Sequence, residues 1–162
     1  MTTLSATRDI DAPLSIVWQT LSDFGGVHKF SATVEASPIT DGTPSSGVGA
    51  ERVCTMCDGN RIEERVTASV EDSLLGIKIV SSSMPLKSAE ARFDLVANAA
   101  GGTQVTMTMT YVVKFGLLGQ LMDALMMKRA MTTTLGNILT GLGHHVPTGE
   151  VLVKGWKPAI AA

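Results

Sequence analysis

The sequence predicts an α+β fold, in which a curved antiparallel sheet packs its apolar face against one long helix. Three observations support this prediction. Residues 50–115 form short segments of alternating apolar and polar residues, separated by tight turns, which is typical of neighbouring antiparallel strands. Pro13 opens a short helical segment near the N-terminus, and a long helical pattern with one apolar stripe follows the last strand. A sheet and a helix of this kind bury their apolar faces against each other.

The N-terminal part of the chain contains a strand, a helix and a loop. Residues 3–12 (TLSATRDIDA) alternate and predict the first strand. The helix begins at Pro13 and ends at the glycine pair that follows Phe24. Residues 27–39 predict a short turn or helix and then a strand, and residues 40–49 (TDGTPSSGVG) are a loop rich in Gly, Pro, Ser and Asp.

The central part of the chain predicts a meander of five strands. They cover residues 50–56, 61–71, 74–83, 88–98 and 103–115. The connecting turns are short, so consecutive strands should pair antiparallel.

Residues 117–143 predict the long helix. Its apolar stripe steps by three or four residues through Ala124, Met127, Met131, Leu135, Ile138 and Leu142. The residues that follow have no strong pattern. We therefore expect a single domain over residues 1–145 and a C-terminal tail over residues 146–162.

The composition excludes several classes of protein. Apolar residues make up 44% of the chain and charged residues 17%, so a disordered chain is excluded. A net charge of -2 and the absence of a Lys/Arg run argue against nucleic acid as a partner. No apolar run approaches the roughly 20 residues that span a bilayer, and the N-terminus lacks the pattern of a secretory signal. A cytoplasmic location without stable membrane insertion is expected.

The sequence predicts neither a metal nor a cofactor. Cys54 and Cys57 form a CxxC pair in a strand-like stretch, whereas a redox pair begins at a helix N-terminus. The histidines at 28, 144 and 145 do not complete a zinc site with familiar spacing. Phosphate-binding, dinucleotide-binding and serine-hydrolase motifs are absent. Two reduced thiols in a hairpin is the preferred interpretation of the cysteines.

Three short motifs, taken in order, resemble the START-like (SRPBCC) superfamily in its polyketide cyclase/dehydrase branch. The first is I-x-A-P-x-x-x-V-W over residues 10–18, leading into the helix and Asp23-Phe24. The second is G-x-G-A-x-R over residues 47–52, followed by IEERV one hairpin later. The third is YVV at the end of the last strand, over residues 111–113.

The resemblance implies a helix-grip fold, with a seven-stranded antiparallel sheet around the C-terminal helix and two short helices closing one end. Between helix and sheet it implies a cavity for apolar ligands such as lipids, sterols, polyketides or plant hormones. Members of the superfamily include cyclases, lipid carriers and hormone receptors, so the resemblance does not imply one activity. Plant-hormone binding is disfavoured, because the basic residue expected after the short helices is matched by FSATVE, whose only ionisable member is Glu35.

A face rich in methionine is the first candidate for a cavity wall. Side chains alternate along a strand, so Val105, Met107, Met109 and Tyr111 share one face. If that face meets the long helix, the expected partners are Met126, Met127, Ala130, Met131 and Thr134. Methionine suits surfaces that accept ligands of loosely defined shape, but a filled core explains the same pattern. A buried tyrosine needs a partner for its hydroxyl, and the resemblance places Tyr111 in the pocket.

Glu64, Arg52 and His28 are the candidate polar residues of the site. Glu64 is the single acid on a strand face otherwise formed by Ile62, Val66, Ala68 and Val70. Arg52, on the same face as Cys54 and Met56, could pair with Glu64 and hold it ionised, which favours anchoring over proton transfer. Solvated positions for Glu64 and Arg52 are the alternatives. His28 lies where the resemblance implies the cavity mouth, and is either a general base or an exposed loop histidine.

These features lead to two hypotheses from the sequence. The first is a protein that binds a small apolar molecule carrying a polar group, with Glu64, Tyr111 and Arg52 orienting that group. The alternative is a polyketide cyclase/dehydratase-type enzyme in which Glu64 or His28 moves protons. A third possibility, a scaffold with a filled core, predicts no cavity of roughly 300 Å³. The identity of the ligand and of any protein partner stays open at this point.

Overall fold

Seven antiparallel strands from the described part of the chain form one sheet in the order β1-β7-β6-β5-β4-β3-β2. The computed structural model describes residues 1–114 and 126–158. Its strands are β1 (Thr2–Ile10), β2 (Val34–Ala36), β3 (Glu51–Met56), β4 (Arg61–Val70), β5 (Leu74–Ser82), β6 (Leu86–Ala97) and β7 (Thr103–Val113). Its helices are α1 (Leu14–Ser22), the 3-10 helix η1 (Phe24–Lys29) and α3 (Lys128–Thr148). The predicted α+β class and the seven-stranded helix-grip arrangement are confirmed.

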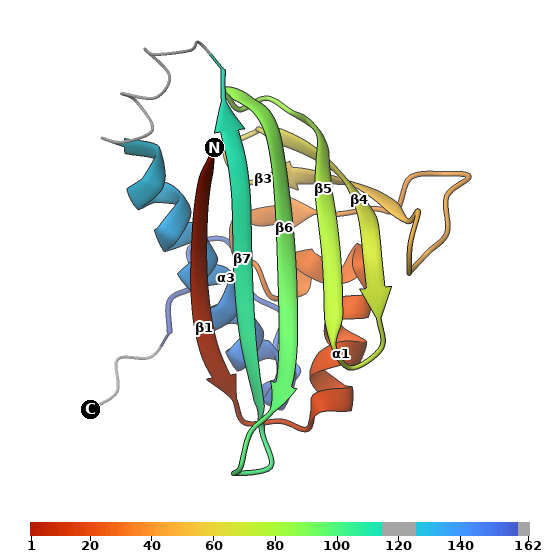
Figure 1. Ribbon diagram of the computed structural model, residues 1–162, viewed down its shortest axis with the longest axis vertical. Helices are drawn as coiled ribbons and strands as arrows, with labels where there is room; N and C mark the ends of the chain where they lie inside the picture. Colours follow the sequence, from red (N-terminus) through yellow and green to blue (C-terminus); the bar gives the residue numbers. More distant parts are fainter. Residues whose placement is uncertain (115–125, 159–162) are drawn as a thin grey trace.

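The helices lie on one face of the curved sheet. Figure 1 shows α3 behind β1 and β7, with α1 behind the lower ends of the strands, where it also contacts α3. The alternation in β7 follows this arrangement, because Val105, Met107, Met109 and Tyr111 are all buried while the intervening threonines are partly exposed. Two of these threonines instead bond to β1 on the outer face, Thr106 to Thr7 at 2.9 Å and Thr110 to Thr3 at 3.1 Å.

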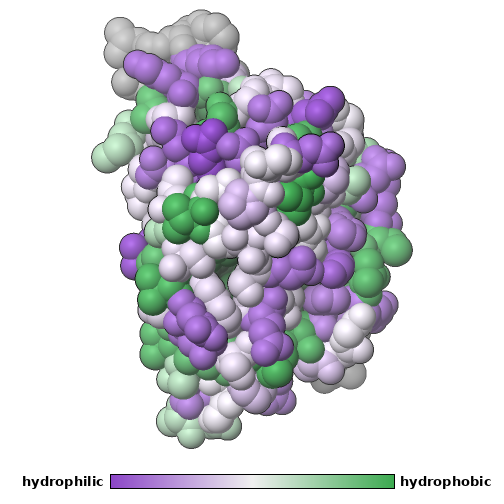
Figure 2. Space-filling view, turned by 90° about the vertical axis from the view of Figure 1, so that its right-hand side faces the viewer, coloured by the Kyte–Doolittle hydropathy of each residue, from purple (hydrophilic) through white to green (hydrophobic). Residues whose placement is uncertain are grey.

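The hydrophobic core lies between the sheet and the helices. Trp18 and Leu21 of α1 and Leu135 and Leu139 of α3 belong to the same buried cluster as the inward side chains of β5, β6 and β7. On the side of the molecule drawn in Figure 2, apolar residues form small groups scattered among hydrophilic ones. Scattered apolar residues are ordinary on a protein surface. Among the described residues, no helix is long and apolar enough to cross a membrane.

The long helix differs from its predicted limits. The predicted first part, including Ala124, lies outside the described residues. At the other end, α3 continues beyond Gly143 to Thr148, so the predicted boundary at residue 145 falls inside the helix. It ends at Gly149, whose φ of 70° lies in the left-handed region that favours glycine. Gly143, where the predicted helix ends, lies inside α3. Its position is close to β1, since a Cβ there would lie 2.9 Å from Nε of Arg8.

The segment after α3 folds back onto the domain. Leu152 is 5% exposed, and its backbone N–H donates to the carbonyl oxygen of Lys29 at 2.9 Å. The Nζ atom of Lys154 donates to the carbonyl oxygen of Cys57 at 3.1 Å. His144 contacts the carboxylate of Glu150 at 2.7 Å, which holds the start of the segment against α3. The described part of the tail is therefore attached to the domain through these contacts, although most of its residues are exposed.

Gly141 sets the distance between α3 and η1. A Cβ at this position would overlap the carbonyl oxygen of Phe30, which is a backbone atom and cannot rotate away. Gly141 therefore occupies the helix interior because no larger residue fits there, although glycine is a poor helix former.

We predict that Gly141→Ala destabilises the protein by about 1–3 kcal/mol, the usual cost of overpacking. The matched control is Gly136→Ala in the same helix, where a Cβ would meet nothing within 4 Å. That substitution should stabilise the fold by up to about 1 kcal/mol, because alanine is the better helix former. Urea denaturation followed by circular dichroism measures both. Equal effects of the two substitutions would contradict the close approach.

We also predict that Leu152→Ala lowers the free energy of unfolding by about 2–4 kcal/mol, as expected for a buried leucine. Val153→Ala is the control, since Val153 is 68% exposed and should change stability by less than about 0.5 kcal/mol. Denaturant unfolding of both variants checks whether the C-terminal segment is an integral part of the domain. A Leu152→Ala variant as stable as wild type would show that it is not.

Candidate functional site

Arg52 and Glu64 form an ion pair on the sheet face that the helices cover. They are directly opposite each other in the β3–β4 ladder. Both Nε and Nη2 of Arg52 lie 2.6 Å from Oε2 of Glu64. The side chains are 8% and 15% exposed, respectively. The predicted pairing is thus confirmed, and the solvated alternatives for both residues are wrong.

The guanidinium of Arg52 contacts Phe24 of η1 as well as Glu64 of β4. Its Nη1 donates to the carbonyl oxygen of Phe24 at 2.6 Å. Its central carbon lies 4.1 Å from the centre of the Phe24 ring, in a cation–π contact. A residue of β3 therefore bonds at the same time to β4 and to the start of η1. The side chain of Arg52 thus links the β3–β4 side of the sheet to η1.

Cys54 lies beside the same carboxylate. It follows Arg52 on the same strand face, and its thiol donates to Oε2 of Glu64 at 3.5 Å. Burial, reinforced by the negative charge of Glu64, raises the pKa of the Cys54 thiol to about 12. A thiol that keeps its proton is a poor nucleophile and a poor metal ligand. Both cysteines are free thiols, and Cys54 serves as a small buried donor.

The ion pair begins a row of directly paired residues across the sheet. Glu64 is opposite Ile79, Ile79 is opposite Ala89, and Ala89 is opposite Tyr111. Directly paired residues point to the same face, so Arg52, Glu64 and Tyr111 share one row. Three strand spacings, about 14 Å, separate Glu64 from Tyr111. The side chains between them are a small alanine and an isoleucine.

Part of the covered face around Glu64 is incompletely buried, although Ala89 and Tyr111 in the same row are 2% and 1% exposed. The partly buried residues next to Glu64 are Ile62, two positions before it on β4, and Ile79, directly opposite it on β5. Met56, Met84, Val113 and Met127 are partly buried as well. Deeper along the same strands, Val66, Ile77, Phe93 and Val105 are all buried to 5% exposure or less. Apolar surface therefore stays accessible around the carboxylate of Glu64.

The predicted methionine wall is only partly assembled. Met107, Met109 and Met131 are buried at 6–8% exposure and belong to the hydrophobic core, as does Tyr111. Met127 is partly buried against that core.

Three further residues correct the prediction, because Met126, Ala130 and Thr134 are exposed. They recur every four residues, about 100° around the helix from the buried Met131 and Leu135. Their expected packing against the methionines of β7 is therefore wrong.

His28 lies in η1 and has a fixed ring. Its Nδ1 lies 2.9 Å from Oγ of Ser37 and 3.1 Å from the carbonyl oxygen of Gly25. Oγ of Ser37 itself donates to that carbonyl at 2.6 Å, so Nδ1 of a neutral His28 carries the proton in this arrangement. The ring is half-buried, which corrects the alternative of an exposed loop histidine.

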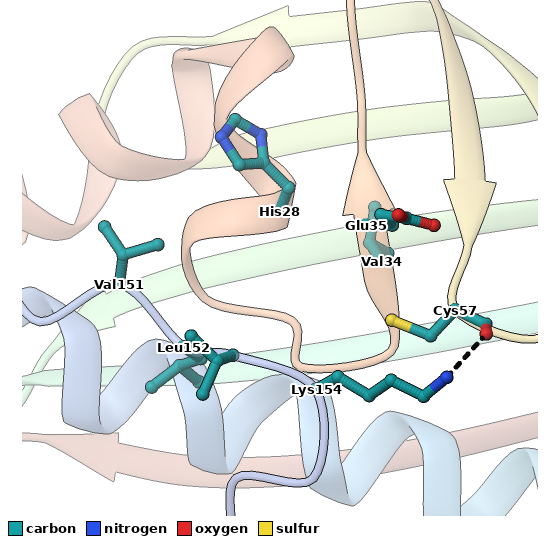
Figure 3. A pocket seen from close by; sticks show the side chains of 8 residues that line it. His28, Val34, Glu35, Cys57, Val151, Leu152 and Lys154 are labelled. Carbon is teal, nitrogen blue, oxygen red and sulfur yellow. Dashed lines mark hydrogen bonds between the residues drawn. The ribbon is translucent and has the colours of Figure 1, made fainter.

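A pocket of about 280 Å³ lies beside His28, where η1, β2 and the C-terminal segment meet. Its lining also includes Val34, Glu35, Cys57 and residues 151–154. Figure 3 shows these residues on η1, on β2, just after β3 and on the C-terminal segment, with Lys154 bonded to the backbone of Cys57. Neither Arg52 nor Glu64 lines it. The two candidates for proton transfer, His28 and Glu64, are therefore not brought together in this pocket.

The sequence did not predict this pocket, because the tail had no strong pattern. Val151 and Val153 are exposed while Leu152 is buried, so the short alternation in residues 151–153 was the available signal. In the part of the chain that the structure describes, no three His, Cys, Asp or Glu residues are grouped so that they could hold a metal ion.

The fold and the match to a family model together indicate a class of proteins with a hydrophobic ligand-binding fold. The chain belongs to the family described as polyketide cyclase/dehydrase and lipid transport, whose model matches residues 1–146. The resemblance to the START-like superfamily is thereby confirmed. A search of curated protein sequences finds no match.

Solved structures support the same fold at low sequence identity. The protein XoxI from Bacillus cereus has a TM-score of 0.74 and 15% identity, over 91% of this chain and 97% of that one. The protein TTHA0849 from Thermus thermophilus has a TM-score of 0.74 and 18% identity, over 91% and 99% of the two chains. A START superfamily protein from Mycobacterium smegmatis has a TM-score of 0.72 and 15% identity, over 90% and 97%.

We predict that Arg52→Ala destabilises the protein by about 3–5 kcal/mol, because Glu64 and the carbonyl of Phe24 would lose their partner in a buried setting. Arg65→Ala is the matched control. It removes the neighbouring, more exposed pair with Glu51 and should cost at most about 1 kcal/mol. Thermal and urea unfolding measure the difference. Similar losses of stability in the two variants would contradict the expectation that the buried pair of Arg52 contributes more than the exposed pair of Arg65.

We further predict a loss of stability at high pH that depends on Cys54. The folded protein keeps the thiol proton up to about pH 12, because the pKa is raised there, whereas the unfolded chain releases it near the ordinary value of 9.0. The free energy of unfolding should therefore fall between these pH values, by up to about 1.4 kcal/mol per pH unit. In Cys54→Ala this decrease should be smaller, while Cys57→Ala keeps Cys54 and should keep the decrease. Urea denaturation between about pH 8 and pH 11 checks both.

Proposed function

We propose that the protein binds a small, mostly apolar molecule that carries at least one polar group. The ligand would lie on the covered face of the sheet, with its polar group at Glu64 and its apolar body against the partly buried residues beside it. The observation that carries the proposal is the position of Glu64, a carboxylate at 15% side-chain exposure among apolar side chains that are not fully packed. The family match to proteins of lipid transport and polyketide chemistry supports the same class of ligand.

The geometry favours binding over proton transfer. Arg52 lies 2.6 Å from Oε2 of Glu64, and the thiol of Cys54 donates to the same oxygen, so the carboxylate is fixed in place by its partners. His28 lines a different pocket and directs Nδ1 to backbone and serine partners. Ordering and anchoring a ligand is the role that these contacts support.

Native mass spectrometry of the freshly purified protein provides the direct test. We expect a bound apolar molecule, or saturable uptake of one when neutral amphiphiles are added to the stripped protein. Saturation at one molecule per chain supports the proposal. Absence of any bound species, together with absence of uptake up to the solubility limit of the amphiphiles, would overturn it.

A bulky side chain introduced next to Glu64 should weaken the binding of amphiphiles. Ile79 is directly opposite Glu64 and partly buried, so Ile79→Trp should occupy the accessible apolar space and weaken amphiphile binding at least about tenfold, a change of about 1.4 kcal/mol. Val80→Trp is the matched control, because Val80 is the next residue and is 48% exposed; its binding should stay within about twofold of wild type. Fluorescence titration measures both, and equal affinities would place the ligand elsewhere.

A further inference from the structure

We propose that this site selects ligands by an uncharged hydrogen-bond donor, such as the hydroxyl of an alcohol or phenol or the N–H of an amide, which binds Oε1 of Glu64. Carboxylate amphiphiles such as fatty acid anions would be rejected. The inference rests on the proposed function and specifies the chemistry of its polar contact. It follows from which atoms of the ion pair already have partners.

The two carboxylate oxygens of Glu64 are in different situations. Oε2 receives both contacts from Arg52 and the contact from Cys54. Oε1 has no hydrogen-bond partner among the described residues. Among these residues, the one fully buried side-chain oxygen or nitrogen without a partner belongs to Asp72, so Oε1 of Glu64 is not fully buried. It therefore remains in contact with accessible space. An ionised carboxylate oxygen accepts hydrogen bonds and cannot donate them, so it favours a donor on the ligand.

Arg52 is a poor partner for an anionic ligand. Three of its five N–H groups already have partners, two on Glu64 and one on Phe24. One face of the guanidinium is covered by the Phe24 ring at 4.1 Å. Its side chain is only 8% exposed, and its charge is matched by Glu64. A ligand carboxylate near Arg52 would therefore also meet the carboxylate of Glu64.

The neighbouring cations point away from the site. Arg61 and Arg65 alternate with Glu64 along β4 and are exposed, and Lys78 of β5 and Arg92 of β6 are exposed as well. The sequence of residues 115–125 contains neither Lys nor Arg. On these strands, a carboxylate ligand would therefore meet the negative charge of Glu64 with no inward cation to offset it. Like charges at short range repel in a weakly screened site.

Three ligands with eleven carbons test the proposal on the wild-type protein. Undecan-1-ol carries a donor, its isomer 1-methoxydecane carries only an acceptor, and undecanoate is an anion at about pH 8. Dissociation constants come from displacement of the neutral fluorophore N-phenyl-1-naphthylamine, with native mass spectrometry giving the stoichiometry. We expect the alcohol to bind at least about tenfold more tightly than the ether, since a bond to a charged acceptor is worth about that much. The anion should bind most weakly.

The comparison separates failure of the inference from failure of the proposed function. An ether that binds at least as tightly as the alcohol overturns donor selection, because the site would then have no net preference for a ligand that carries a donor. An anion that binds most tightly overturns it too, since a cation would then dominate the site. In both cases the binding function stands. If none of the three ligands binds, the proposed function fails and the inference fails with it.

Two variants assign the selectivity to Glu64. Glu64→Gln removes the charge but keeps an oxygen facing Arg52, and it should reduce the alcohol-to-ether preference at least about fivefold. Glu63→Gln changes the adjacent carboxylate, which is exposed, and should leave the preference unchanged. If Glu64→Gln binds with the wild-type preference, Glu64 is not the acceptor. If that variant does not fold, the three-ligand comparison on wild type still decides the proposal.

Discussion

The ion pair between Arg52 and Glu64 is the interaction that holds the β3–β4 side of the sheet against the helices. It joins β3 to β4, and through the carbonyl and ring of Phe24 it also joins the sheet to η1. A buried ion pair costs free energy to desolvate, and apolar residues of the same volume often stabilise a fold as well or better. Removing one partner of such a pair is nevertheless strongly destabilising, because the other charge is then left buried and unpaired.

The rest of the covered face is divided between packing and accessible surface. Near α1 and the last turns of α3, the strands are fully covered, and Gly141 lets α3 approach the backbone of Phe30 so closely that no space is left between them. Towards Glu64, residues such as Ile62 and Ile79 keep part of their surface accessible. The domain therefore combines a well-packed core with apolar side chains that keep part of their surface accessible.

Local patterns predicted a large part of this arrangement. The alternation in β7 and β4 identified the inward faces, and the position of Glu64 on its face predicted a pair with Arg52 before any register was known. These predictions succeeded because side-chain direction in a strand depends only on parity along the chain. For α3, the predicted apolar stripe is packed over its described part, from Met127 to Leu142. The prediction failed for Met126, Ala130 and Thr134, which lie outside that stripe and are exposed because a helix packs through one stripe.

By itself, the sequence determined the strand order in the chain, the residues that share a face in β3, β4 and β7, and the resemblance to a helix-grip family. Each of these depends on periodicity and turn chemistry, which are local properties. The tertiary structure decided that α3 continues past Gly143 to Gly149, that Leu152 packs back onto η1, and that Arg52 occupies Oε2 of Glu64 and leaves Oε1 accessible. These are contacts between residues distant in the chain, and only the folded arrangement brings their atoms together.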